Sequence, residues 1–175
     1  MLGAGVPEPC FPRLQMEFEG AMVAIHCPVE AVICAATTGA RDEGLRRELA
    51  GWAEGQAAMV AAWHAVQMLL RFLNGDGPAD FAGASAAYTA ALVCWAFGEF
   101  GGGEEGWVEN ADVRVYLGEM HTESWEGLGR VGVRSRRATG GMLTVVAGML
   151  KGCRWGAIEE ARQVLLRLAE GRKSV

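Results

Sequence analysis

In this 175-residue chain, His64 is the first candidate for chemistry, because of its residue type and its surroundings. It follows Trp63 directly, inside the apolar stretch AAWHAVQMLLRF (residues 61–72). An imidazole can act as a general acid or base, but that role needs a carboxylate, thiol or hydroxyl partner and a pocket. The local sequence supplies none of these. We therefore predict that His64 is a partly buried structural histidine with one hydrogen bond.

The five cysteines are the next candidates, as metal ligands or as nucleophiles. Cys10, His26, Cys27 and Cys34 lie in one stretch, but they lack the paired ligands at short fixed spacing that a structural zinc site requires. Adjacent side chains on a helix point about 100° apart, so His26 and Cys27 do not form a thiol–imidazole pair. The odd number and the absence of a Cys-x-x-Cys pair predict reduced thiols in an intracellular protein, with no metal site and no catalytic residue.

A short basic run, VRSRRATGG (residues 133–141), precedes a predicted helix. Arg134, Arg136 and Arg137 could hold an anion there. They could also direct a basophilic kinase to Thr139, since a phosphate would lie close to the arginines and to the helix end. A solvated loop is the favoured interpretation of such a charge run. Thr139 remains a candidate phosphorylation site.

The element that must position His64 is the strongest periodic signal in the chain. From Asp42 to Leu73, apolar residues recur at alternating steps of four and three, which is the pattern of an amphipathic helix. Its seam is Leu45, Leu49, Trp52, Gln56, Met59, Trp63, Val66, Leu70 and Leu73. Asp42 is the expected N-cap and Asn74-Gly75 the expected stop. Gly51 and Gly55 weaken the middle, where a break or kink is expected if one occurs.

Helical periodicity continues along most of the chain. We expect helices over 14–27, 29–37 and 79–97, the last with Pro78 at its start, and two more in the tail. In the tail, one apolar face is Met142, Val145, Val146 and Met149, and the other is Trp155, Ile158, Ala161, Leu165 and Leu168. VRVYL (113–117) is the one short extended segment. The predicted fold is all-α, an irregular bundle of about five to seven helices. Residues 1–39 form a helical segment packed on 40–175, and 11–170 is best treated as one domain.

Composition limits the classes of function. Apolar residues make up 51% of the chain, enough for a sizeable core. A net charge of −5 gives no general attraction for phosphate backbones. The N-terminus lacks the apolar core of a secretory signal, and no run approaches the ~20 apolar residues that cross a bilayer. The sequence therefore predicts a soluble protein that contacts no membrane.

Three stretches together resemble the fungal-specific transcription factor regulatory domain. AAWHAVQMLLRF resembles its W-H-A-G-Q segment, with Trp63, His64 and Gln67 matched and Val66 where the family tends to have glycine. FAGASAAYTAALVCWAFGEF (81–100) is similar to its following helix, which ends in a tryptophan, here Trp95, and an aromatic residue. The third block, 141–168, resembles its C-terminal signature, with these residues at the family spacing: Arg154, Trp155, Glu160, Ala161, Val164 and Leu165. The blocks span roughly residues 40–170.

The resemblance implies an all-α regulatory module that acts in the nucleus, in transcription by RNA polymerase II, without catalytic residues. Members of the family have a zinc finger or zinc cluster N-terminal to this region, and this chain shows neither. It therefore resembles the C-terminal part of the regulatory domain, with no zinc or other cofactor of its own. The expected partners are proteins, through self-association or other transcription regulators. Specific DNA binding by this chain alone is not expected.

Two alternatives stay open at this point. A small-molecule-binding or enzymatic α-helical protein is favoured if several polar groups converge in a pocket between the long helix and the helix that carries Tyr88 and Trp95. A truncated remnant without independent function is favoured if an apolar face stays exposed with no complementary surface in the chain.

Overall fold

The computed structural model describes residues 11–75, 80–101 and 136–171, and side-chain positions from residue 13 and, in the last range, from residue 139. This described part contains seven α-helices and no strand, which confirms the all-α prediction. The extended segment predicted at 113–117 lies outside it. The helices are α1 (Phe11–His26), α2 (Val29–Thr38), α3 (Glu43–Ala53), α4 (Gln56–Leu73), α5 (Phe81–Phe100), α8 (Arg136–Leu150) and α9 (Gly156–Ala169).

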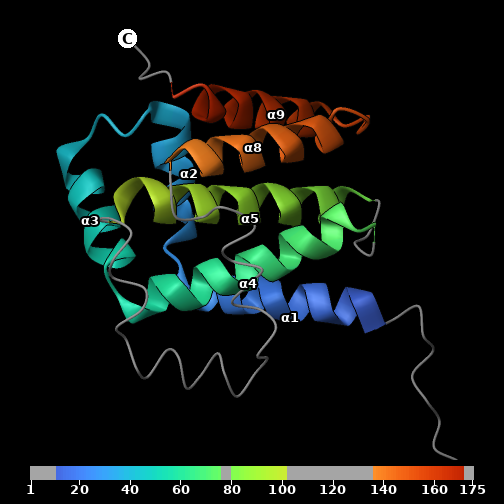
Figure 1. Ribbon diagram of the computed structural model, residues 1–175, viewed down its shortest axis with the longest axis horizontal. Helices are drawn as coiled ribbons and strands as arrows, with labels where there is room; N and C mark the ends of the chain where they lie inside the picture. Colours follow the sequence, from blue (N-terminus) through green and yellow to red (C-terminus); the bar gives the residue numbers. More distant parts are fainter. Residues whose placement is uncertain (1–10, 76–79, 102–135, 172–175) are drawn as a thin grey trace, which may run out of the picture.

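α5 is the central helix of the bundle (Figure 1). α4 packs on one side of it and α1 packs on α4, while α8 and α9 cover the other side. The shorter α2 and α3 close one end, where α5 and α9 finish and α8 begins. The indole Nε1 of Trp52 on α3 donates to the His26 carbonyl oxygen at the end of α1, 2.8 Å away, which ties this end to the first helix.

The predicted long helix is two helices. Its ends are where the sequence placed them: Oδ1 of Asp42 accepts from the backbone N–H groups of Gly44 and Leu45, and α4 ends at Leu73 before Gly75, whose φ is 81°. The prediction of one helix through Trp52–Leu73 is wrong, because Gly55 is extended and caps α4 anew. A Cβ at Gly55 would lie 3.2 Å from the Trp52 carbonyl oxygen, so this tight turn favours glycine.

α5 is built for close packing. Asp80 caps it, with Oδ1 accepting from the Gly83 N–H at 2.9 Å. Its small residues are buried and let neighbouring helices approach; these are Gly83, Ala84, Ala87, Ala90, Ala91 and Ala96. α5 is also 20 residues long and apolar enough to cross a bilayer, contrary to the expectation that no run approaches that length. However, 61% of its apolar window is buried inside the bundle, as in the core helix of a globular domain.

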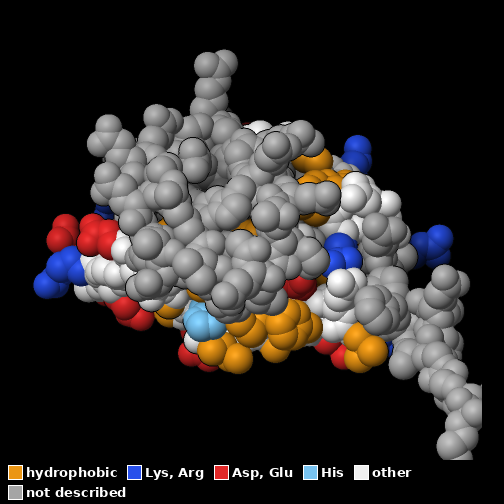
Figure 2. All heavy atoms as spheres, turned by 60° about the horizontal axis from the view of Figure 1, so that its bottom comes forward, with side chains coloured by type: hydrophobic (Ala, Val, Ile, Leu, Met, Phe, Trp, Pro, Cys, Tyr) orange, Lys and Arg blue, Asp and Glu red, His pale blue; other side chains and the backbone are white. Residues whose placement is uncertain are grey.

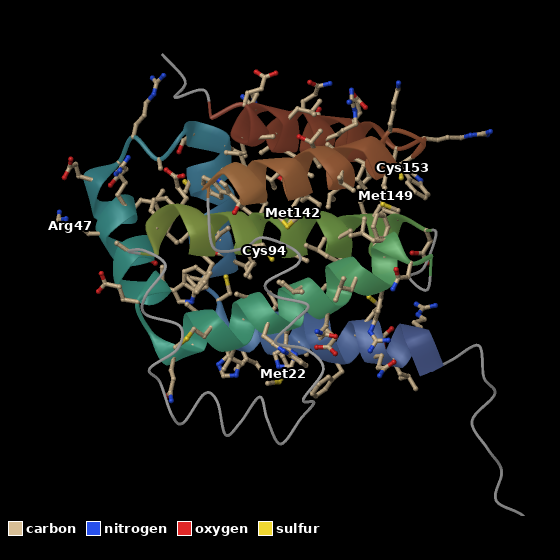
Figure 3. The ribbon with its side chains drawn as sticks, in the orientation of Figure 1. Met22, Arg47, Cys94, Met142, Met149 and Cys153 are labelled. Atoms are coloured by element: carbon tan, nitrogen blue, oxygen red, sulfur yellow. The ribbon has the colours of Figure 1, made fainter. Side chains whose placement is uncertain are left out.

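The tail forms the two predicted helices, but α8 begins earlier and faces differently. It starts at Arg136, so part of the run expected to be a loop is helical. Val145 and Met149, predicted to face the core, are 54% and 40% exposed. The buried face is shifted by about one position and consists of Met142, Leu143, Val146, Ala147 and Leu150. Figure 3 shows Met142 between α8 and α5.

Candidate functional site

A buried acid–imidazole pair joins α1 to α4. Nδ1 of His64 is hydrogen-bonded to Oε2 of Glu19, across 45 residues of sequence. His64 is fully buried and Glu19 is 5% exposed. The structure thus gives His64 one hydrogen bond, as predicted, in a setting with no solvent contact rather than a partly buried one.

The pair exists because α1 places one acidic residue on an otherwise apolar face. Met16, Glu19, Val23 and Cys27 follow one another at steps of three, four and four, and all are buried. This spacing puts them on one side of α1, against α4. A buried carboxylate needs a hydrogen-bonding partner, and His64 is the partner that α4 provides.

Two aromatic rings enclose the imidazole. Trp63 lies edge to face with it at a centroid distance of 4.8 Å, and Phe18 does so at 5.8 Å. Trp63 is 2% exposed, whereas Phe18 is 47% exposed and forms the outer wall. Face-to-edge contacts of this kind stabilise a ring in one orientation. His64 is therefore fixed by one hydrogen bond and by two perpendicular ring contacts.

The chemistry open to this pair is limited by its burial. A carboxylate that accepts from Nδ1–H leaves Nε2 as the free ring nitrogen, which is the arrangement found in general-base and metal-binding histidines. Here Nε2 is buried and has no hydrogen-bond partner among the described residues, and the same holds for Nε1 of Trp63. No group of three His, Cys, Asp or Glu side chains that could hold a metal ion occurs among the described residues. The pair joins α1 to α4, and neither side chain is open to solvent.

The remaining residues singled out from the sequence lie in other places. Gln67 is half-buried on α4. Trp95 is 9% exposed and packs edge to face with Phe100 at 5.7 Å, near the far end of α5. Arg154, Trp155 and Glu160 are exposed at the start of α9.

Trp155 is a correction to the sequence prediction, which placed it in the core. It is 40% exposed and makes an edge-to-face contact with Phe81 at 5.7 Å. The physical reason is that Trp155 is the N-cap of α9, with extended backbone, so the helical period that defines the buried face does not include it.

Thr139 is 3% exposed in the first turn of α8. A kinase needs the hydroxyl in an extended, accessible segment, so phosphorylation here would require local opening of the helix end. Arg134 lies outside the described residues, and the side chains of Arg136 and Arg137 are not described.

The described cysteines carry free thiols. Burial raises the pKa of Cys27 to about 12, and burial together with the neighbouring Cys27 raises that of Cys94 to about 12. Since the thiolate is the nucleophile, neither sulfur is activated at neutral pH. Cys10 lies outside the described residues.

Glu19 and Phe18 are the site residues that sequence reasoning missed. The available signal was local: Glu19 is an acid flanked by apolar residues at helical spacing, so its burial could have been predicted. Its partner could not, because the periodicity of α1 does not say which helix covers it.

No protein-family model, curated protein or solved structure matches this chain. The family resemblance therefore depends on the three sequence blocks alone.

Proposed function

We propose that this chain is a helical regulatory and interaction module in transcription by RNA polymerase II, similar to the C-terminal part of the fungal transcription factor regulatory domain. It acts in the nucleus through protein contacts, without a DNA-binding zinc finger of its own and without catalysis. The observation that supports this most is the burial of Trp63 and His64, the centre of the first matched block.

The three matched blocks pack as one body, which also supports the proposal. The first block lies in α4, the second is α5, and the third forms α8, α9 and the turn between them. α5 contacts α4 on one side and both tail helices on the other. The sequence blocks of one domain are expected to pack around one shared hydrophobic core.

Contacts with a protein partner need an accessible apolar surface, and α1 has one. Leu14, Phe18 and Ile25 on α1 are 54%, 47% and 72% exposed, although the Phe18 ring also contacts His64 at one edge of the buried face. Met22 extends from the same helix (Figure 3). Figure 2 shows hydrophobic side chains gathered along the edge to which α1 contributes. We place the contact with another transcription regulator on this α1 face, defined by Leu14, Phe18, Met22 and Ile25.

A tethering assay tests the proposal. The full chain is fused to a heterologous DNA-binding domain and expressed with an RNA polymerase II reporter. Reporter output should change severalfold relative to the DNA-binding domain alone, because the module brings its partner to the promoter. A folded fusion that leaves the reporter at the level of the DNA-binding domain alone contradicts the proposal and favours the remnant interpretation.

Two serine substitutions locate the contact. Ile25→Ser on the α1 face should reduce the effect on the reporter, since it removes the most exposed apolar side chain there. Val145→Ser is the matched control, because Val145 is another exposed apolar side chain, at 54%, but lies on α8, on the other side of α5. Both variants should melt like the wild type. Equal loss in both variants would argue against the α1 face.

A further inference from the structure

A cavity of about 240 Å³ lies at the end of the bundle where α2 and α3 close it. The last turns of α5 and α9, the first turns of α8, and the turn from α2 to α3 form its walls. Glu19, Trp63 and His64 do not line it. The cavity is therefore independent of the buried pair and of the proposed regulatory function.

Two arginines line the cavity from different helices, Arg46 on α3 and Arg167 on α9. Neither guanidinium makes a hydrogen bond or an ion pair with any residue in the part of the chain that the structure describes. Burial raises the pKa of the Tyr88 phenol, and the positive charge of Arg167 opposes part of that rise. Both arginines are exposed, so their guanidinium groups are open to solvent and to a ligand that enters the cavity. Arginines at the wall of one cavity can bind an anion through charge-assisted hydrogen bonds.

The helix dipoles do not explain both arginines. Arg167 lies in the last turn of α9, where a cation is favoured by the dipole. Arg46 lies near the start of α3, where a cation is disfavoured. Glu99 also lines the cavity, so the charged side chains that the structure describes at its walls are two arginines and one glutamate. Their formal sum of one positive charge suits a ligand with one negative charge better than a phosphate or a dicarboxylate.

The inner walls are apolar and aromatic. Leu143 is fully buried, Trp95 is 9% exposed, and Phe100 packs edge to face against Trp95. Drug-sized ligands occupy cavities of roughly 300–1,000 Å³, so this one is small. At about 30 Å³ for each water, its volume corresponds to about eight waters, which matches a ligand of roughly ten non-hydrogen atoms.

We propose that this cavity binds a small organic monocarboxylate. The carboxylate is held by Arg46 and Arg167, and a single ring or a branched aliphatic body contacts Trp95 and Phe100. For a regulatory module such a ligand would be an effector. The site stands on its own geometry, and failure of the tethering assay would leave it unaffected.

Titration calorimetry of the full chain with benzoate tests the site, with benzamide as the neutral ligand of equal shape. Benzoate should bind saturably and with one site per chain. Benzamide should bind at least about tenfold more weakly, because it lacks the charge that the guanidinium groups recognise. Equal affinity for the two compounds, or no binding of benzoate to folded protein, would overturn the proposal.

Three glutamine variants assign the contact. Arg46→Gln and Arg167→Gln should each weaken benzoate binding about tenfold, since each removes one charge-assisted hydrogen bond. Arg47→Gln is the matched control: Arg47 follows Arg46 in the chain and is exposed like it, but it does not line the cavity and extends away from the bundle in Figure 3. Melting curves verify that all three are folded. Benzoate affinities of the two cavity variants equal to that of Arg47→Gln would overturn the assignment.

Discussion

Replacing either member of the Glu19–His64 pair should destabilise the protein, and replacing both should not. His64→Leu leaves a carboxylate that is 5% exposed without its partner. Leaving a buried carboxylate without its hydrogen-bond donor costs about 3–5 kcal/mol. Glu19→Leu leaves the buried imidazole with no hydrogen bond at either nitrogen, which costs about 1–3 kcal/mol.

The double variant, with leucine at both Glu19 and His64, tests whether the two side chains are energetically coupled. Replacing both polar groups by leucine removes both desolvation penalties, so its free energy of unfolding should lie within about 1 kcal/mol of the wild type. The single costs sum to about 4–8 kcal/mol, so the coupling energy should reach about 3 kcal/mol or more, at the upper end for residues in contact. His64→Gln retains a donor for Glu19 and should cost only about 1 kcal/mol.

Urea unfolding followed by far-UV circular dichroism measures these differences. A domain of this kind has about 5–15 kcal/mol of stability, so His64→Leu should shift the midpoint visibly without changing the slope. Glu17→Gln is the control, because Glu17 is an exposed carboxylate two residues from Glu19, and it should change stability by no more than about 0.5 kcal/mol. Single costs near that of the control, or strict additivity in the double variant, would refute the reasoning.

Three further predictions follow from particular positions. Gly140→Ala should destabilise the fold by about 1 kcal/mol, because the new Cβ would lie 3.1 Å from a backbone oxygen of α9. Gly141→Ala has open space around its Cβ and should stabilise the fold by up to about 1 kcal/mol. Calorimetric melting that ranks the two variants in the other order would contradict this. A thiol reagent at neutral pH should modify exposed Cys34 long before buried Cys94, as peptide mass spectrometry will show, and equal rates would contradict the burial described here. The backbone N–H groups of Leu45 and Gly44, in that order of effect, lower the pKa of Asp42 in the folded protein. The cap therefore stabilises the fold fully above the ordinary carboxyl pKa of 3.8, and this stabilisation is lost as the pH falls through the lower folded pKa. The stability difference between wild type and Asp42→Ala should shrink only in that acid range.

Local signals in the sequence predicted the helix ends well. The cap at Asp42 and the stop at Asn74-Gly75 depend on groups within a few residues of one another. The local sequence therefore includes every residue that takes part in ending the helix. The break at Gly55 was located only as a weak point, because the free energy of a glycine in a helix is small and tertiary packing decides whether the helix continues.

Contacts between helices were the part that sequence reasoning could not supply. Glu19 and His64 are 45 residues apart, and no local pattern in either helix indicates that the two helices pack together. The arginines Arg46 and Arg167 line one cavity for the same reason, since α3 and α9 both lie at the end of α5. The exposed position of Val145 shows a related limit, because periodicity defines an apolar stripe but not which edge of it the neighbouring helix covers.

The most direct test of the account is a DNA titration, because it separates a protein-binding module from a protein that reads DNA itself. The chain has a net charge of −5, and DNA affinity through counterion release needs several converging cations. Purified protein titrated into labelled random-sequence and promoter DNA at two salt concentrations should show only weak non-specific attachment, with a Kd above roughly 10⁻⁴ M at physiological salt. Sub-micromolar, sequence-selective binding by this chain alone would contradict the account.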